Sequence, residues 1–186
     1  MRSSLNVGAR SMIPSIVTTR LKLVPATVAH ARAEICDRVE FARLLQAMIP
    51  ENWPPESAAD ALPLFLKWLE AAPDRVGWFG WYVLAQSDDV NDPVLVGCCG
   101  FLGPPRDGDV NIGYSVLPQF QRRGFATEMI GGLVHWAFEQ PAVIRIVAET
   151  EWANPASVRV LTTVGFAAVG PSADHRGTRF ELSRGV

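Results

Sequence analysis

The sequence has no excess of charge of either sign and no long apolar run. Its 186 residues include 17 basic and 19 acidic side chains, which gives a net charge of −2. Proteins that bind nucleic acids without regard to sequence usually carry a basic balance or stripe, so we expect no direct nucleic-acid partner. The longest apolar runs, LPLFL and VLVGCCGFLG, are much shorter than the roughly 20 residues that cross a bilayer. We therefore expect no membrane partner.

Cysteine is scarce, with only Cys36, Cys98 and Cys99 in the chain. Adjacent cysteines inside an apolar run favour buried free thiols in a reducing compartment over a disulfide framework. The N-terminal stretch MRSSLNVGARSMIPSIV lacks the apolar core of an export signal. These features predict a cytoplasmic protein. The CxxC and HExxH spacings of metal sites are absent, so we expect no metal.

Length and composition predict one globular domain. The hydrophobic fraction of 48% is typical of a folded protein, and the chain is long enough for one core. Residues 1–14 are small and polar, so we expect them to form a flexible N-terminal segment. Residues 15–186 then form the single domain, because no internal repeat or linker divides them.

Hydrophobic periodicity predicts an α/β (α+β) domain with a mixed sheet and helices on its faces. The turns between the middle strands contain DDVND and PPRDGD, which suit hairpins. The expected helices cover residues 28–37, 39–48, 57–73, 125–138 and 155–164. The seven expected strands cover residues 15–27, 77–86, 92–103, 108–118, 143–150, 165–170 and 177–184.

The stretch QRRGFAT places two arginines and a glycine directly before an amphipathic helix. Helix N-termini present unpaired N–H groups and a partial positive charge, which favour phosphate groups. Gly124 lets the backbone approach a ligand, Thr127 adds a hydroxyl donor, and Arg122 and Arg123 raise the local potential. The Walker pattern GxxxxGK[ST] and the dinucleotide pattern GxGxxG are both absent. The stretch predicts a pyrophosphate loop, or alternatively an ordinary loop with two solvated arginines.

Three segments together resemble one known family. The pattern [QR]-x-x-G-x-[GA], which is Gln121 to Ala126 here, follows a strand ending in Pro118 and opens a helix. It resembles the acetyl-CoA loop of the GNAT superfamily of N-acetyltransferases. The longer stretch IGYSVLPQFQRRGFATEM is similar to the ribosomal-protein N-terminal acetyltransferase-like (RimJ/RimL) branch. TTRLKLVPAT resembles that branch's opening strand, and ETEWANPASVRVLTTVGF its strand–Asn–helix–Gly-Phe segment. The resemblance covers nearly the whole chain after residue 14.

This resemblance implies a GNAT fold that binds acetyl-CoA. Its central twisted sheet is mixed and mostly antiparallel, with about seven strands flanked by helices. Two neighbouring strands splay apart to admit the pantetheine arm, because an open strand edge offers N–H and C=O groups. An N–H near Val116 would polarise the thioester carbonyl. The alternative is a plain buried strand at this place. The implied acetyl-CoA residues are Ser115, Val116, Leu117, Gln121, Arg122, Arg123, Gly124, Phe125, Ala126, Thr127, Asn154 and Ser157.

The helix after Asn154 departs from the family at one position. The resemblance implies that Asn154 bonds the cofactor arm, and an Asn before Pro155 also suits a helix cap. Many relatives carry a Tyr at the position of Leu161, where it protonates the departing thiolate. Leucine cannot donate a proton, so Ser157, one turn earlier, is the expected substitute as a catalytic residue. The alternative is that Ser157 merely packs.

Glu149 is the expected general base, because some relatives place a catalytic Glu at this position. A carboxylate inside the apolar run VIRIVAET costs free energy unless it is paired or functional. The alternatives are an ion pair, for example with Arg145, or a partly exposed strand end. Glu151, Asp174 and His175 are further candidates near the same end of the sheet. Cys98 and Cys99 have no activating partner nearby in sequence, so we expect direct attack without an acyl-enzyme.

The expected function is acetyl transfer from acetyl-CoA to a primary amine, with a protein N-terminal α-amine as the leading acceptor. A small-molecule amine is the alternative acceptor, and a non-catalytic acyl-CoA-binding module is the rival of a different class. Trp53 and His175 are the candidates for contact with the acceptor, from the loop PENWPPE and the turn PSADHRG. The oligomeric state is left open between a monomer and a homodimer.

Overall fold

The structure is a computed structural model that describes residues 13–86 and 92–185. Most of the N-terminal segment expected over residues 1–14, and most of the turn expected at DDVND, lie outside these described residues. Within them, no helix is long and apolar enough to cross a membrane.

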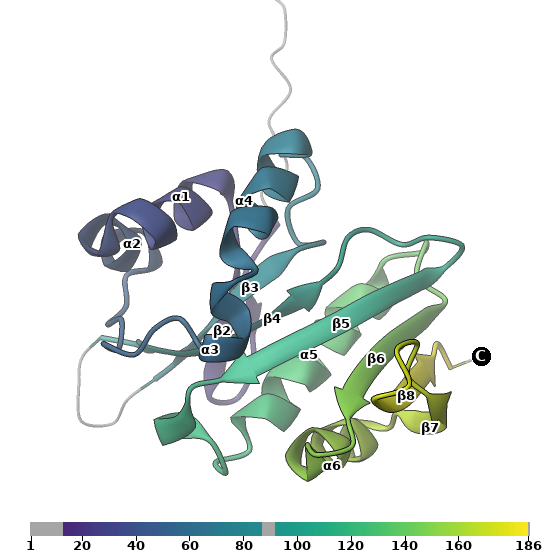
Figure 1. Ribbon diagram of the computed structural model, residues 1–186. Helices are drawn as coiled ribbons and strands as arrows, with labels where there is room; N and C mark the ends of the chain where they lie inside the picture. Colours follow the sequence, from purple (N-terminus) through teal and green to yellow (C-terminus); the bar gives the residue numbers. More distant parts are fainter. Residues whose placement is uncertain (1–12, 87–91, 186) are drawn as a thin grey trace, which may run out of the picture.

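The centre of the molecule is one eight-stranded sheet with the order β1-β2-β3-β4-β5-β6-β8-β7. Neighbouring strands are antiparallel except for β5 and β6, which run parallel, so the sheet is mixed and mostly antiparallel as expected. Figure 1 shows this sheet with helices packed on both faces. The strands are β1 (Ile16–Val17), β2 (Leu21–Pro25), β3 (Gly80–Ala85), β4 (Val94–Phe101), β5 (Asp109–Val116), β6 (Arg145–Glu151), β7 (Ala167–Pro171) and β8 (Gly177–Ser183).

Two expected elements are broken in the structure. The first expected strand is divided into β1 and β2 by a turn in which the Thr18 N–H donates to the Leu21 carbonyl at 2.9 Å. The helix expected over residues 57–73 is divided at Asp60–Ala61, because Pro63 has no N–H to continue the ladder from the preceding turn. The helices are α1 (Val28–Cys36), α2 (Arg38–Leu45), α3 (Glu56–Ala59), α4 (Leu62–Ala71), η1 (Pro118–Phe120), α5 (Phe125–Glu139) and α6 (Pro155–Val164).

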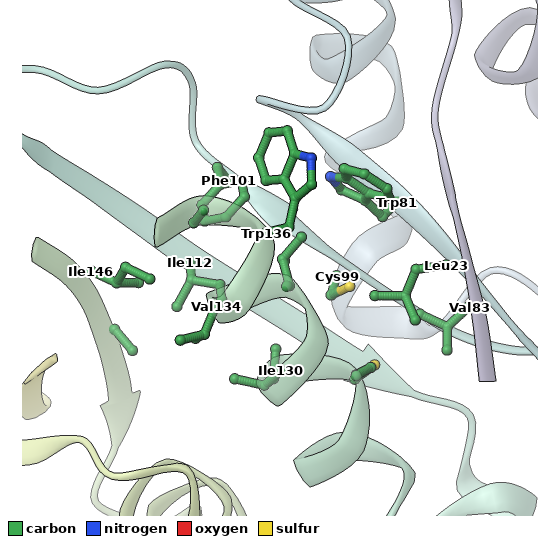
Figure 2. Close-up of a cluster of buried hydrophobic side chains, with 14 of the residues drawn as sticks. Leu23, Trp81, Val83, Cys99, Phe101, Ile112, Ile130, Val134, Trp136 and Ile146 are labelled. Atoms are coloured by element: carbon green, nitrogen blue, oxygen red, sulfur yellow. The ribbon is translucent and has the colours of Figure 1, made fainter. Parts of the chain in front are cut away.

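Each face of the sheet has its own hydrophobic cluster. One cluster lies against α5 and α6 and contains Trp81, Phe101 and Trp136; Figure 2 shows the Trp136 side chain of α5 between those of Phe101 and Trp81. The Trp136 ring lies edge-on to Trp81 at 5.2 Å between centroids. The second cluster lies under α1, α2 and α4 and includes Phe41 and Tyr82. The sheet therefore packs against helices on both faces, and the cluster under α1, α2 and α4 contains residues of β3 and β4 but none of β6, β7 or β8.

The sheet opens between its two parallel strands. β5 pairs with β6 only from Asp109 to Asn111, opposite Arg145 to Val147. Beyond these three pairs the strands diverge, as the arrows of β5 and β6 do in Figure 1. The connections that follow the diverging ends lead into α5 and α6 respectively. The expected splay of two neighbouring strands is therefore present, and both helices that flank it begin at its mouth.

Candidate active site

The gap between β5 and β6 is a cleft of about 810 Å³. It is lined by the diverging ends of the two strands and by the first turns of the two helices that follow them. From the β5 side come Gly113, Tyr114, Ser115, Val116, Gln121, Arg122, Gly124, Phe125, Ala126 and Thr127; from the β6 side come Glu149, Glu151, Asn154, Ser157, Arg159 and Val160, among others. Most of the residues expected to bind acetyl-CoA thus meet in one hollow; Leu117 and Arg123 do not line it.

Only alternate residues of β5 turn their backbone toward the gap. The Leu117 N–H donates to Val96 of β4 at 2.9 Å, and the Asn111 carbonyl accepts from Leu102 at 3.0 Å. Since N–H and C=O groups alternate between the two edges of a strand, Ser115 also faces β4 with its backbone. Tyr114 and Val116 therefore present the edge that faces the cleft. The Gln121 side-chain amide donates to the Val116 carbonyl at 3.0 Å and ties the loop to this edge.

The N-terminus of α5 opens into the same cleft. Gly124 is the N-cap with φ 80°, and no side chain caps the helix there. The preceding Arg122 is also left-handed, with φ 62°. This backbone turns the N–H groups of Phe125, Ala126 and Thr127 toward the hollow that these residues line. The first turn of α5 therefore offers donors and a partial positive charge to an anion.

The two loop arginines have different places. Arg122 lines the cleft, whereas the Arg123 guanidinium lies over the Phe120 ring at 5.7 Å and is not among the lining residues. The Arg123 carbonyl accepts a hydrogen bond from Arg20 at 2.9 Å. Of the two side chains, only that of Arg122 adds charge directly at the hollow.

Glu128 braces the loop from behind. Its carboxylate accepts from the Thr18 hydroxyl at 2.6 Å and from the Arg20 N–H at 2.7 Å, and it pairs with the Arg20 guanidinium at 2.7 Å. That guanidinium also lies over the Phe125 ring at 4.9 Å. Burial opposes ionisation of Glu128, but these hydrogen bonds and the charge of Arg20 outweigh it and lower the pKa. The partners of Glu128 lie 108 and 110 residues away in sequence, where local pattern gives no signal.

Tyr114 is a site residue that the sequence reasoning missed. Its phenol lies 2.7 Å from the Ser157 hydroxyl, so the pair bridges the cleft from β5 to α6. Burial raises the pKa of Tyr114, although the bond with Ser157 opposes the shift. The phenol therefore keeps its proton at neutral pH and can donate it. The alternation of side chains along β5 could have identified Tyr114 from the sequence. Tyr114 lies two residues before Val116, so both side chains are on the same face of the strand, and Val116 was already expected to bind the cofactor.

The start of α6 is shaped by Asn154. Its side-chain oxygen accepts from the Ser157 N–H at 3.0 Å, which confirms the expected cap. Asn154 also lines the cleft, so the capping and binding interpretations are compatible. Leu161, one turn after Ser157, is fully buried in the cluster under the sheet. The side chain at position 161 therefore offers no polar group to the cleft.

Glu149 lines the cleft from the β6 side, but it is exposed rather than buried. Its ion-pair partner is Arg179 of β8, at 3.7 Å, and not Arg145, which pairs with Asp109 and Glu181. The carboxylate also accepts a hydrogen bond from the Ala173 N–H at 3.4 Å. The pairing of Asn111 with Val147 and the two-residue period of each strand place Glu149 and Ser115 on the same face of the sheet. The carboxylate is therefore available beside the opening.

The other candidate acids are less well placed. Glu151 also lines the cleft. Asp174 accepts hydrogen bonds from the Ser172 hydroxyl and the Arg176 N–H, which lower its pKa, in the turn between β7 and β8. His175 lies in the same exposed turn, with φ 56°. Neither Asp174 nor His175 is among the residues that line the cleft or the pocket beside it.

A second hollow, the pocket beside the cleft, has a volume of about 260 Å³ and lies on the face of the sheet that α1 and α4 cover. It shares Gly113, Tyr114 and Ser115 with the cleft. Trp53 forms part of its wall, as does Cys98. Burial and the nearby charge of Glu34 raise the pKa of the Cys98 thiol to about 12, so it is not a ready nucleophile. No group of three or more potential metal-binding side chains occurs within residues 13–86 and 92–185.

Comparison with protein families matches residues 20–167 to the acetyltransferase (GNAT) domain. A curated relative is the FsC-acetyl coenzyme A-N(2)-transacetylase of Aspergillus fumigatus, 27% identical over 167 residues. That match covers 84% of this chain and 66% of the relative. The N-acetyltransferase YoaA of Bacillus subtilis, itself uncharacterised, is 35% identical over 77 residues, 41% of this chain and 44% of its own. The chain thus spans two thirds or less of the length of these relatives.

Solved structures share the fold. A ribosomal-protein-alanine acetyltransferase from Vibrio fischeri superimposes with a TM-score of 0.61 at 16% identity, over 92% of this chain and 97% of that chain. RimL, a ribosomal alpha-N-protein acetyltransferase in complex with coenzyme A, gives a TM-score of 0.60 at 17% identity, over 91% and 97% of the two chains.

The Glu128 brace predicts a pH-dependent contribution to stability. Because the folded pKa is below the ordinary 4.5, ionised Glu128 stabilises the fold above that pH, and the effect is lost as the pH falls through the folded pKa. Glu128→Gln should lower the free energy of unfolding near pH 7 by roughly 1 to 3 kcal/mol. Urea unfolding at a series of pH values measures the difference, which should shrink below pH 4.5.

The control is Glu139→Gln on the same helix, whose side chain is 60% exposed. It should change stability by no more than about 0.5 kcal/mol. A Glu128→Gln difference that persists unchanged in acid would contradict a role for the charge.

Proposed function

The chain belongs to the acetyltransferase (GNAT) family, and on this premise we propose that it transfers the acetyl group of acetyl-CoA to a primary amine. One observation carries the proposal: an open β5 edge leads directly to an uncapped helix N-terminus in a single cleft. A long ligand fits this arrangement if its amide groups pair with the strand edge and its phosphates bind at the helix N-terminus. The RimL relative was solved with coenzyme A, which supports the same choice of ligand.

In this proposal different residues of the cleft bind different parts of acetyl-CoA. The N–H groups of Phe125, Ala126 and Thr127 hold the pyrophosphate, with Arg122 adding charge. The cleft-facing backbone of Tyr114 and Val116 pairs with the amides of the arm. Acetyl-CoA supplies an acetyl thioester, and in the balanced reaction amine and acetyl-CoA give N-acetylamine and free CoA. Of the residues implied by the family resemblance, Leu117 and Ser115 serve as strand framework, because their backbones face β4.

Glu149 is proposed as the general base. The attacking nitrogen forms the new C–N bond and must lose one proton, for which a carboxylate beside the opening is the natural acceptor. The demand on the base is modest for an N-terminal α-amine, since about a tenth of it is already neutral at pH 7. Positioning the amine against the thioester then supplies most of the remaining acceleration.

Tyr114 and Ser157 are proposed to return the proton to the leaving sulfur. The phenol carries the proton and the Ser157 hydroxyl orients it from 2.7 Å. The pair thus supplies from β5 the phenol that Leu161 lacks on α6. Reaction proceeds by direct attack, because the raised pKa of Cys98 disfavours a thiolate that could carry the acetyl group.

The proposed acceptor is a protein N-terminal α-amine, in keeping with the ribosomal-protein acetyltransferases that share the fold. A small-molecule amine is the second candidate, favoured by the small volume of the pocket beside the cleft. A non-catalytic acyl-CoA-binding module would bind the same ligand without turnover. Amine-dependent release of free CoA, measured with a thiol reagent, separates the enzyme from the module.

Gly124→Asp tests the pyrophosphate loop. A carboxylate at the helix N-terminus repels the phosphates, so acetyl-CoA affinity should fall at least about tenfold, measured by calorimetric titration with NAD and ATP as selectivity controls. Gly124→Ala carries the same strain at φ 80° without the charge, and Gly131→Asp adds a carboxylate on α5 where a Cβ meets open space. Unchanged affinity in a folded Gly124→Asp variant would remove the loop from the binding site.

Glu149→Gln tests the base. The loss of kcat/KM should be greatest at low pH, where little of the amine is neutral, and should narrow as the pH rises toward the pKa of the amine. The measurement is the pH–rate profile of CoA release. Glu181→Gln is the matched control, because Glu181 also pairs with Arg179 but is not among the residues lining the cleft. Parallel profiles for wild type and Glu149→Gln would exclude Glu149 from this role.

Tyr114→Phe tests the proton donor. We expect kcat to fall by roughly a hundredfold, the lower end of what a positioned proton donor contributes. Acetyl-CoA affinity should stay nearly constant, because the backbone contacts of Tyr114 are retained. Steady-state kinetics with the same amine give kcat, and calorimetry gives the affinity. Full activity of the variant would assign the proton transfer to solvent or to Ser157 alone.

A further inference from the structure

Glu34 is a part-buried carboxylate that the proposed reaction does not use. It belongs to α1 and lines the 260 Å³ pocket. Its two oxygens accept from the Trp53 indole at 2.8 Å and from the Tyr82 phenol at 2.6 Å. Both donors are neutral. In the part of the chain that the structure describes, no Lys, Arg or His side chain forms an ion pair with Glu34.

The remaining wall of the pocket is mostly apolar. Glu34 is the only carboxylate among the described residues that line it, and the other side chains include Ala31, Leu62, Phe65 and Leu69. A carboxylate without a cation in such surroundings is costly, since burial disfavours the charged form. Accordingly, burial raises the pKa of Glu34, against the hydrogen bonds from Tyr82 and Trp53. A cation that enters the pocket would offset this cost.

The pocket leads from Glu34 to the place of reaction. Tyr82 of β3 pairs with Cys98 of β4, and Cys98 pairs with Ser115 of β5, so the three side chains form one row on one face. All three line the pocket, and Ser115 also lines the cleft. Two strand spacings, about 10 Å, separate the backbones at the ends of this row. The pocket thus joins the Glu34 carboxylate to the open edge of β5.

Resting on the proposed function, we propose that this pocket binds the acceptor and that Glu34 holds a second cationic group of it while its primary amine reaches the cleft. Glu34 accepts from the phenol of Tyr82, whose backbone is two strand spacings, about 10 Å, from that of Ser115. Since a base takes a proton over roughly 3.2 Å, the proposal makes Glu34 a specificity residue and not the base. The acceptor class is then a dication: a diamine, or a peptide whose N-terminal residue has a basic side chain.

The test uses wild-type protein first. Diamines of increasing chain length are compared with monoamines of equal length, and peptides beginning with lysine with peptides beginning with norleucine, which has a similar shape without the charge. The KM for the best dication should be at least about tenfold lower than for its neutral counterpart, as a charge-assisted contact in a desolvated pocket implies. Whichever series shows the preference identifies the source of the dication.

Glu34→Gln should abolish that preference by raising the KM for the dication, while the kcat and the acetyl-CoA affinity stay nearly unchanged. Glu40→Gln is the control, because Glu40 is an α2 carboxylate paired with Arg43 and is not among the residues that line the pocket. Calorimetric titration of the best dication into the protein with bound CoA gives a readout that needs no turnover, and Glu34→Gln should weaken this binding to the same extent.

The possible failures can be told apart. CoA release with equal KM for dications and their neutral counterparts in wild type would overturn the role of Glu34 and leave the transferase standing. Absence of CoA release with every amine would instead overturn the proposed function. If the Glu34→Gln variant does not fold, the comparison of KM values for dications and their neutral counterparts in wild-type protein still tests the proposal.

Discussion

The divergence of β5 from β6 is the constraint on which the rest of the molecule depends. Parallel pairing stops after Asn111 and Val147, so the later backbone groups of β5 face a cleft in place of a neighbouring strand. A strand edge in the middle of a sheet is costly unless something else pairs with it. The fold accommodates the opening because α5 and α6 cover one face and anchor both strands through a continuous apolar cluster. Figure 2 shows that cluster reaching from Leu23 to Ile146.

The opening also explains why groups of unlike chemistry lie close together. The positive end of α5 lies at one end of the cleft, the Tyr114–Ser157 bridge crosses it, and Glu149 lies at its rim on the opposite face of the sheet. The face with Ser115 carries the apolar pocket and Glu34, whereas Tyr114 points to the other face. The proposed proton donor, Tyr114, and the proposed proton acceptor, Glu149, thus lie on opposite faces of the sheet. In the proposed reaction, this separation lets one group take a proton while another supplies one.

The sequence predicts most of the framework because its signals are local. The glycine before α5, the Asn154 cap and the alternation of β5 each depend on residues within one or two turns. What it missed depends on distant partners: Arg20 with Glu128, Tyr114 with Ser157, and Glu34 with Tyr82. For Glu149, an ion pair with Arg145, four residues earlier on its own strand, was only the alternative to the role of general base; the ion-pair partner in the structure is Arg179 of β8. Side-chain pairing across a sheet is set by register, which single-sequence patterns do not specify.

In the proposed mechanism, a phenol on β5 supplies the proton that the family resemblance assigns to a tyrosine on α6. Leu161 is fully buried in the apolar cluster, so a tyrosine at this position would have to place its larger ring there. A phenol on β5 can reach the cleft from the opposite side, because Tyr114 and α6 border the same cleft. A phenol on a strand of a rigid sheet has its backbone fixed, and the hydroxyl of Ser157 fixes its tip. The proposed proton donor is therefore held at both ends, which is what a phenol on β5 needs in order to protonate the leaving sulfur without a tyrosine on α6.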